Sequence, residues 1–208
     1  MLYREKATRI AEAEARKKVR EQGSNTGPDV RKYQRADGLV LDPDTGYAWC
    51  ASFAVWAFEN AGRPLVELHE SASVGYLLSY AGKHGWRVTK PARGDLVCFY
   101  WDAGDWPDHV AIVTKVRPDG VLLTVEGNTS GPEGDGVYAK TRDPKALRVS
   151  YIRVPGEDAK PDPVARATFA SIRGVGPRER IIAVANSPEQ AAREVERLLK
   201  RGAHGARV

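Results

Sequence analysis

Hydrophobic and polar positions divide the chain into a helical first part and a strand-rich second part. Residues 2–22 are mostly strong helix formers with sparse apolar positions, which predicts a surface helix ending before Gly23. Residues 50–60 are apolar almost all round and Gly62 follows them, which predicts a buried helix with Cys50 in its first turn. A further helix is predicted over residues 71–84, and a short helical turn is plausible around residues 29–35.

After Trp86 the apolar pattern changes to short segments rich in β-branched and aromatic residues, separated by turn signals. These segments are GDLVCFYW, HVAIVTKV, GVLLTVEG and GVYAKTR. They predict an antiparallel meander. Helices followed by strands indicate an α+β fold, in which N-terminal helices pack on an antiparallel sheet of about five strands and the domain ends near Val154.

The C-terminal part is predicted to be a separate, small unit. The main domain is expected over residues 1–155 and a Pro-rich, charged linker over 156–163. Residues 164–208 then form an annex with one strand and one helix, the latter beginning with a capping box at Ser187. A wall-binding role and a packing or oligomerisation role stay open for this annex.

Composition excludes several classes of protein. Two cysteines, Cys50 and Cys98, and four widely spaced histidines suit neither a disulfide-stapled miniprotein nor a four-ligand zinc site. Basic residues outnumber acidic ones at both ends of the chain, whereas residues 36–155 carry 15 acidic and 12 basic residues. No nucleic-acid-binding module is recognisable, so we expect an anionic partner other than nucleic acid. Neither a secretory signal nor a membrane-spanning stretch is expected.

Candidate chemistry centres on Cys50. A thiol at a helix N-terminus is favoured as thiolate, although a lone cysteine is more commonly a small buried hydrophobe. His109 opens a strand, and Glu126 and Asn128 end the next strand along the chain. Adjacent antiparallel strands place the start of one beside the end of the other, so these polar residues are predicted to be neighbours. The pattern is that of a nucleophile, a base and a group that orients the base.

The motifs, in this order, resemble the cysteine- and histidine-dependent amidohydrolase/peptidase family, the CHAP domain, within the papain-like group that includes NlpC/P60 enzymes. The resemblance covers about residues 5–154 and rests on SNTGPDVRKY, YAWCASFAVWAFENAG, PARGDLVCFYW, WPDHVAIVTKV and VLLTVEGNTS. It implies that Cys50 is the nucleophile, His109 the general base and Glu126 the group that orients the imidazole. Asn128 is a second polar partner or the alternative third member.

The resemblance also implies a function. CHAP enzymes mostly cut amide bonds of peptidoglycan, either between N-acetylmuramic acid and L-alanine or within the stem peptide and cross-bridge. The absence of a signal peptide is typical of phage endolysins, which are made in the host cytoplasm and act on the wall after release, although a bacterial origin also fits. The alternative is a non-catalytic wall-binding module that keeps the CHAP fold. Oligomeric state is left open.

Cofactors and substrate contacts are less clearly marked. The proposed chemistry requires no metal. Some family members bind calcium, and the candidate ligands here are Asp42 and Asp44. Their spacing differs by one residue from the family pattern, and Asp-Pro-Asp is also a good turn. Four aromatic residues flank the candidate site and are predicted to line a substrate groove, with a core position equally plausible for the last two: Tyr47, Trp49, Trp101 and Trp106.

Overall fold

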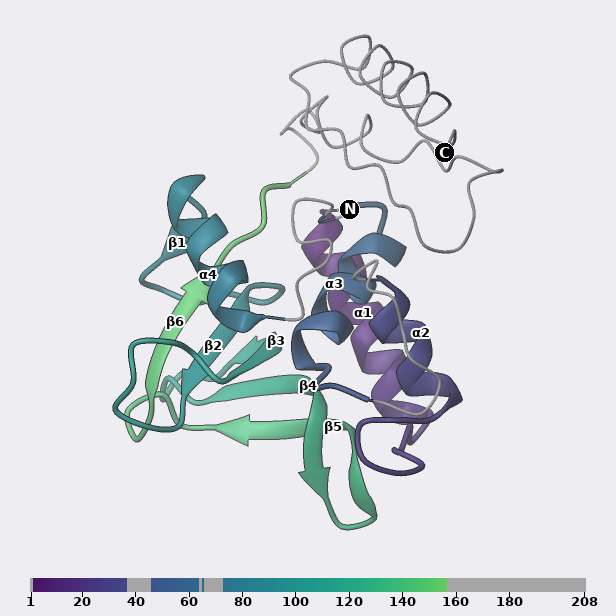
Figure 1. The fold of residues 1–208 in the computed structure, drawn as a ribbon. Helices are drawn as coiled ribbons and strands as arrows, with labels where there is room; N and C mark the ends of the chain where they lie inside the picture. Colours follow the sequence, from purple (N-terminus) through teal and green to yellow (C-terminus); the bar gives the residue numbers. More distant parts are fainter. Residues whose placement is uncertain (1, 37–45, 64, 66–72, 157–208) are drawn as a thin grey trace, which may run out of the picture. The chain divides into compact units, whose positions relative to one another are not determined.

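The computed structural model describes residues 2–36, 46–63, 65 and 73–156 and has an α+β architecture in these residues, as predicted. Figure 1 shows the helices gathered beside a strongly curved sheet. The described elements are α1 (Tyr3–Arg16), α2 (Pro28–Ala36), α3 (Cys50–Asn60), α4 (Val74–Lys83), β1 (Arg87–Val88), β2 (Leu96–Tyr100), β3 (His109–Val116), β4 (Leu122–Gly131), β5 (Gly134–Arg142) and β6 (Arg148–Ile152).

The strands form one antiparallel sheet in the order β1-β6-β2-β3-β4-β5. The predicted meander corresponds to β2 through β5. The chain then returns across the sheet, so that β6 pairs with β2 and adds a strand that the meander pattern does not contain. The two-residue β1 is too short to show any period in the sequence, which is why six strands are described where about five were predicted.

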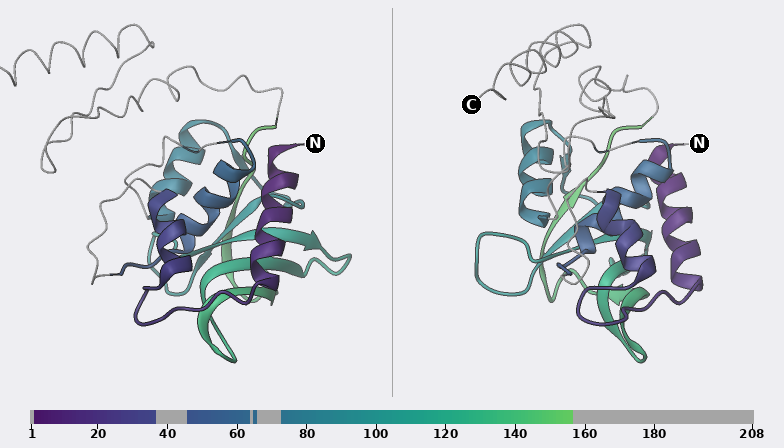
Figure 2. Two further views of the ribbon diagram at one scale, coloured as in Figure 1. Left: turned by 90° about the vertical axis from the view of Figure 1, so that its right-hand side faces the viewer. Right: turned by 45° about the vertical axis from the view of Figure 1, so that its right-hand side comes forward.

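The buried helix α3 packs on the sheet beside the two N-terminal helices. It contacts β3 and β4 as well as α1 and α2, and α1 itself contacts β3, β4 and β5, as can be followed in Figure 2. Along β2, Leu96, Cys98 and Tyr100 face the helices. Val97 and Phe99 belong to a second, smaller apolar cluster on the opposite face, as the alternation of a strand requires.

The predicted first helix is shorter than expected. It ends at Arg16, and Lys18 takes a left-handed backbone conformation with φ 57°. Val19 then accepts a hydrogen bond from the backbone of Val137, and Glu21 donates one to Asp135. Pairing with the edge of β5 therefore overrides the helix propensity of residues 17–22, and it places the Glu21 carboxylate beside Trp49 and Asn128.

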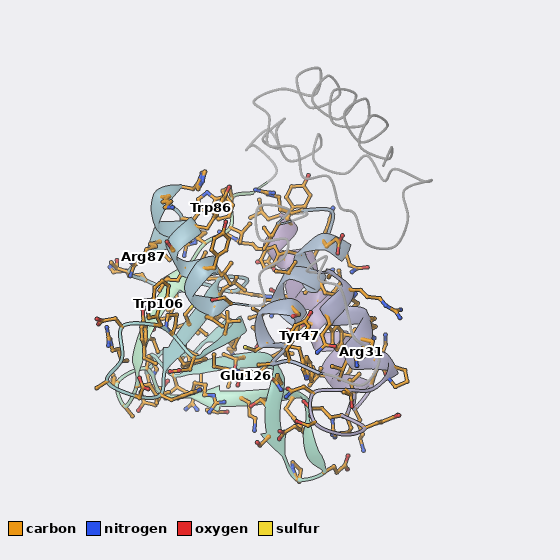
Figure 3. The ribbon with its side chains drawn as sticks, viewed as in Figure 1. Arg31, Tyr47, Trp86, Arg87, Trp106 and Glu126 are labelled. Atoms are coloured by element: carbon orange, nitrogen blue, oxygen red, sulfur yellow. The ribbon has the colours of Figure 1, made fainter. Side chains whose placement is uncertain are left out.

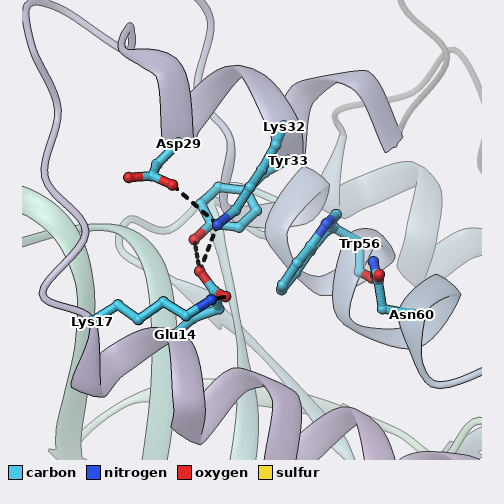
Figure 4. A network of polar contacts seen from close by, with 7 residues as sticks. All are labelled: Glu14, Lys17, Asp29, Lys32, Tyr33, Trp56 and Asn60. Carbon is cyan, nitrogen blue, oxygen red and sulfur yellow. Dashed lines mark hydrogen bonds and ion pairs between the residues drawn. The ribbon is translucent and has the colours of Figure 1, made fainter.

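A buried carboxylate joins α1 to α2 (Figure 4). Glu14 on α1 accepts hydrogen bonds from Tyr33 Oη at 2.6 Å, Lys32 Nζ at 2.8 Å and Lys17 Nζ at 2.6 Å. We call these four residues the Glu14 cluster. The Tyr33 ring stacks on that of Trp49 at 5.3 Å, so this cluster supports the segment that precedes α3.

Other predicted features lie wholly or partly outside the described residues. The helix predicted from residue 71 begins at Val74, where the Ser73 side chain accepts a hydrogen bond from the backbone of Tyr76 as an N-cap. The linker predicted over residues 156–163 and the annex over 164–208 lie beyond the described part, apart from Gly156, and stay predictions. None of the described helices is long and apolar enough to cross a membrane.

Candidate functional site

Cys50 is the first residue of α3, and its side chain lies at the end of the helix where backbone N–H groups have no acceptor within the helix. The preceding residue, Trp49, provides no side-chain cap to these groups. The positive end of the helix dipole therefore faces the sulfur. Only 4% of Cys50 is exposed.

His109 is held next to this thiol at the first position of β3. The backbone N–H of Asp108 donates to the carbonyl of Phe99, which fixes where the strand begins. The imidazole is 6% exposed. Its Nε2 lies 3.0 Å from Glu126 Oε2, and its side chain also forms a hydrogen bond with Cys50. Because Nε2 is occupied by the carboxylate, Nδ1 is the ring nitrogen left for the sulfur.

Glu126 on β4 is fully buried and surrounded by donors. Besides the imidazole, it accepts a bond from Thr124 Oγ1 at 2.7 Å and two from Arg142, at 2.8 Å from Nε and 2.6 Å from an Nη atom. These residues, His109, Thr124, Glu126 and Arg142, are called the Glu126 cluster below. Every donor is directed at the two oxygens of a single carboxylate, which is therefore fixed in position and favoured as an anion.

The electrostatics of the pair follow from this packing. Burial disfavours both charges and would lower the pKa of His109, but hydrogen bonds and charge interactions with Cys50 and Glu126 outweigh it and raise that pKa to about 9. Burial likewise would raise the pKa of Glu126, yet Arg142, His109 and Thr124 together lower it to about 2. The arrangement thus favours an imidazolium beside a carboxylate at neutral pH.

Asn128 occupies a different place from the one that a third catalytic member would take. A bulge in β4 after Glu126 gives Asn128 a left-handed backbone with φ 54°. Its Oδ1 accepts the backbone N–H of Trp49 at 3.0 Å, and its Nδ2 donates to Glu21 Oε1 and to Asn25 Oδ1. The side chain that orients the imidazole is Glu126, whereas Asn128 holds the residue just before Cys50.

Strand β4 approaches α3 closely at Gly127, between these two polar residues. A Cβ atom added there would lie 2.6 Å from Phe53 Cβ and 2.7 Å from the Trp49 ring. Only glycine permits this approach, because real Cβ atoms do not come so near to other heavy atoms. The sequence Glu126-Gly127-Asn128 therefore lets one strand contact both the base and the start of the helix that carries the thiol.

The aromatic residues predicted to line a substrate groove fall into two groups. Trp49 is fully buried, stacked on Tyr33 with its indole N–H on Glu21 Oε1 at 2.7 Å, so the expectation that its ring lines an open surface is wrong. Tyr47 is half-buried and donates its hydroxyl to the carbonyl of Gln34 on α2. In Figure 3, Tyr47 lies beside α2 and Trp106 on the opposite side, toward α4, with Glu126 between them in this view.

Trp101 and Trp106 are both exposed, at 49% and 67%. The Trp101 ring stacks on Phe99 at 5.1 Å and lies 5.9 Å from the ring of His109, so it flanks the base directly. Trp106 packs against the backbone of Gly75 on α4, where an added Cβ would lie 2.1 Å from the indole. These exposures favour a surface position over a core position for both residues.

Metal ligands are not evident in the part of the chain that is described, where no group of three or more His, Cys, Asp or Glu side chains could hold an ion. Asp42 and Asp44 lie outside this part, so calcium binding by them stays a prediction.

The sequence did not point to Arg142, Thr124 or Glu21. Thr124 lies two residues before Glu126 on the same strand, so alternation places both on one face. That Arg142 shares this face becomes visible only once the register of β4 against β5 is known. Glu21 lies in a segment that read as helix. Cys98, by contrast, is fully buried on β2 as expected, and burial raises the pKa of its thiol.

Comparison with known proteins gives a family match for the part of the chain that holds Cys50, His109 and Glu126. The family model described as the CHAP domain matches residues 42–128, a segment that begins before Cys50 and ends on Asn128. No curated protein sequence matches the chain. A crystal structure of an N-acetylmuramoyl-L-alanine amidase from Staphylococcus aureus is similar at 22% identity and a TM-score of 0.40 over 64% of this chain. The match spans 41% of that protein, less than half of its length.

Proposed function

Since the chain contains a CHAP domain, we propose that it is a cysteine-dependent hydrolase that cuts amide bonds of bacterial peptidoglycan. The observation that carries this proposal is the contact series from Cys50 through His109 to Glu126. It places a thiol at a helix N-terminus beside an imidazole whose other nitrogen is held by a buried carboxylate. This is the arrangement needed for nucleophilic attack on a carbonyl group.

In the proposed reaction, the starting state is the ion pair in which His109 Nδ1 already holds the proton of Cys50, and the thiolate sulfur attacks the amide carbon. The tetrahedral oxyanion is stabilised by backbone N–H groups of the first turn of α3, among them that of Cys50, which have no acceptor within the helix. The imidazolium then gives its proton to the leaving amine as the C–N bond breaks. Glu126 stabilises the positive ring throughout.

The second half of the reaction returns the enzyme to its starting state. A water molecule gives a proton to His109 and attacks the thioester carbon, and the C–S bond then breaks. The carboxylic acid product leaves, and His109 keeps the proton taken from water, which restores the imidazolium beside the thiolate. Each proton in this sequence passes between His109, water and the leaving amine, so the two halves of the proposed reaction balance.

The test is the release of new amino groups from purified bacterial walls. Cys50→Ala should lower the rate by ~10³-fold or more, as loss of a nucleophile does in comparable hydrolases. Cys98→Ala is the matched control, because this second thiol is buried on β2 and takes no part in the proposed reaction. Equal rates for wild type and Cys50→Ala would refute the proposal.

Two finer points are part of the proposal. The bond cut is the one between N-acetylmuramic acid and L-alanine or one within the stem peptide and cross-bridge, and mass spectrometry of the fragments distinguishes them by their new termini. The biological setting that we propose is that of a phage endolysin. If walls sediment with the protein but no amino groups are released, the chain is instead a wall-binding module with the CHAP fold.

A further inference from the structure

Arg142 has no role in the reaction as proposed above, yet it makes the most extensive contact with the orienting carboxylate. Its two hydrogen bonds to Glu126, through Nε at 2.8 Å and an Nη atom at 2.6 Å, form the two-point geometry that matches a guanidinium to a carboxylate. With Thr124 and His109 on the same oxygens, rotation of the carboxylate would break several bonds at once. The two bonds from Arg142 therefore restrict the Glu126 carboxylate to the orientation that faces His109 Nε2.

The guanidinium is itself held in place by aromatic rings. Its carbon lies 5.5 Å from the centre of the Phe99 ring and 5.4 Å from that of Trp101. These same two rings flank His109, at 6.0 Å and 5.9 Å between centroids. Arg142 and His109 therefore lie against the same two rings, and the polar contact that Arg142 makes in this cluster is with the carboxylate.

Counting the charges that face one another shows what this arginine does. The ionisable groups around the site are Cys50 from α3, Cys98 from β2, His109 from β3, Glu126 from β4 and Arg142 from β5. Asp108 precedes His109, and its carboxylate accepts a hydrogen bond from the backbone N–H of Trp101. In the reactive state, thiolate, imidazolium, carboxylate and guanidinium sum to zero. Without Arg142 the same groups carry one net negative charge, which burial away from water disfavours.

We propose that Arg142 is a positioning residue of the active site, which holds Glu126 ionised and directed at His109 and thereby stabilises the thiolate–imidazolium pair. This inference rests on the proposed function, because it assigns Arg142 to the same site. It predicts a signed effect: loss of the cation makes every nearby anion less favourable, so the Cys50 thiolate should form only at higher pH.

The experiment measures this thiolate directly and uses no wall substrate. The rate of Cys50 alkylation by iodoacetamide is followed against pH in a Cys98→Ala background, with the modified peptide quantified by mass. For Arg142→Met, the midpoint of the acid limb should rise by about one pH unit, so that alkylation below the midpoint is about tenfold slower. Arg142→Lys keeps the charge and should leave the midpoint near that of the wild type.

A matched control separates this effect from general damage to the sheet. Arg148→Met removes another arginine that lies over an aromatic ring, at 4.3 Å from that of Tyr100. The polar contacts of Arg148 are with Gly104 and Asp105, outside the Glu126 cluster. This variant should not move the midpoint. Arg142→Gln replaces the Met variant if the latter does not fold, because Gln keeps a hydrogen-bond donor for Glu126 while removing the charge.

The outcomes are distinct. A folded, uncharged Arg142 variant whose midpoint coincides with that of the wild type, or falls below it, would overturn the inference. Failure of the protein to release amino groups from walls would instead count against the proposed function alone. The alkylation profile is informative in either case, because it reports on the thiol and not on the substrate.

Discussion

Two of the buried carboxylates, Glu14 and Glu126, bind different kinds of partner. Glu14 and Glu126 each lie almost wholly out of solvent and each accept at least three hydrogen bonds from side chains. For both, burial would raise the pKa of the carboxyl group, and in both cases the surrounding donors lower it instead. By geometry alone, the two sites are built alike.

Their partners differ in whether they exchange protons near neutral pH. Glu14 accepts hydrogen bonds from Lys17, Lys32 and Tyr33. Burial and the Glu14 carboxylate raise the pKa of Tyr33. Burial would lower the pKa of Lys32, but hydrogen bonds with Glu14 and Asp29 outweigh it and raise that pKa. Neither Tyr33 nor Lys32 gives up its proton in the physiological range. Glu126 instead holds a histidine that also contacts a thiol. The comparison teaches that a buried carboxylate becomes part of a reactive site through the group that it holds.

The largest expected difference between the two sites is in activity. Glu126→Gln removes the charge that stabilises the imidazolium, and the rate of wall hydrolysis should fall by about 10³-fold, within the range that general acid–base groups contribute. Release of amino groups per folded molecule is the measurement. Glu14→Gln is the control and should keep nearly full activity per folded molecule; a loss as large as that of Glu126→Gln would remove the distinction.

Acid unfolding is expected to sharpen the comparison further. The pKa of Glu126 is about 2 in the folded chain, below its ordinary value near 4.5, so its ionisation contributes stability that is present above pH 4.5 and lost as the pH falls toward 2. His109 remains protonated throughout this window. Urea unfolding between pH 5 and 2 should show Glu126→Gln losing less stability with falling pH than the wild type, by on the order of 3 kcal/mol.

The corresponding change for Glu14→Gln should be smaller, because two of its partners, Lys17 and Lys32, reach solvent that screens them. If Glu126→Gln unfolds with the same pH dependence as the wild type, the carboxylate is not the anion that the geometry implies.

The smallest expected effects concern the Glu14 cluster at neutral pH. Glu14→Gln should lower the free energy of unfolding by about 1–3 kcal/mol, because Tyr33 and Lys32 lose a charged acceptor. Lys17→Ala should change it by less than about 0.5 kcal/mol, since the Lys17 side chain is 61% exposed. Denaturant unfolding measures both. A larger loss for Lys17→Ala than for Glu14→Gln would contradict this account of the cluster.

Several parts of the site were predictable because they depend on local pattern. Cys50 begins an apolar stretch that reads as a buried helix, and His109 and Glu126 fall at opposite ends of adjacent strands. Strand connection suffices to bring His109 and Glu126 near one another, and the structure does so. The approach of Cys50 to them was expected from the resemblance to the CHAP family.

Other parts depend on long-range contacts that no local pattern encodes. Arg142 reaches Glu126 only because β4 and β5 pair in one particular register. Residues 17–22 have helix-forming side chains but pair with the edge of β5, which places Glu21 under Trp49. Trp49 was expected at the surface because it adjoins the thiol, yet its ring points into the core and leaves only its backbone beside the site.

The bulge in β4 has a consequence for motion. Glu126 fixes His109, and Asn128, two residues further on, fixes the backbone of Trp49 at the start of α3. Both reacting groups are thus anchored to the same short stretch of one strand, with Gly127 in close contact with the helix. If α3 shifts against the sheet, this stretch should carry the thiol and the imidazole together, so that their separation is preserved while the rest of the domain fluctuates.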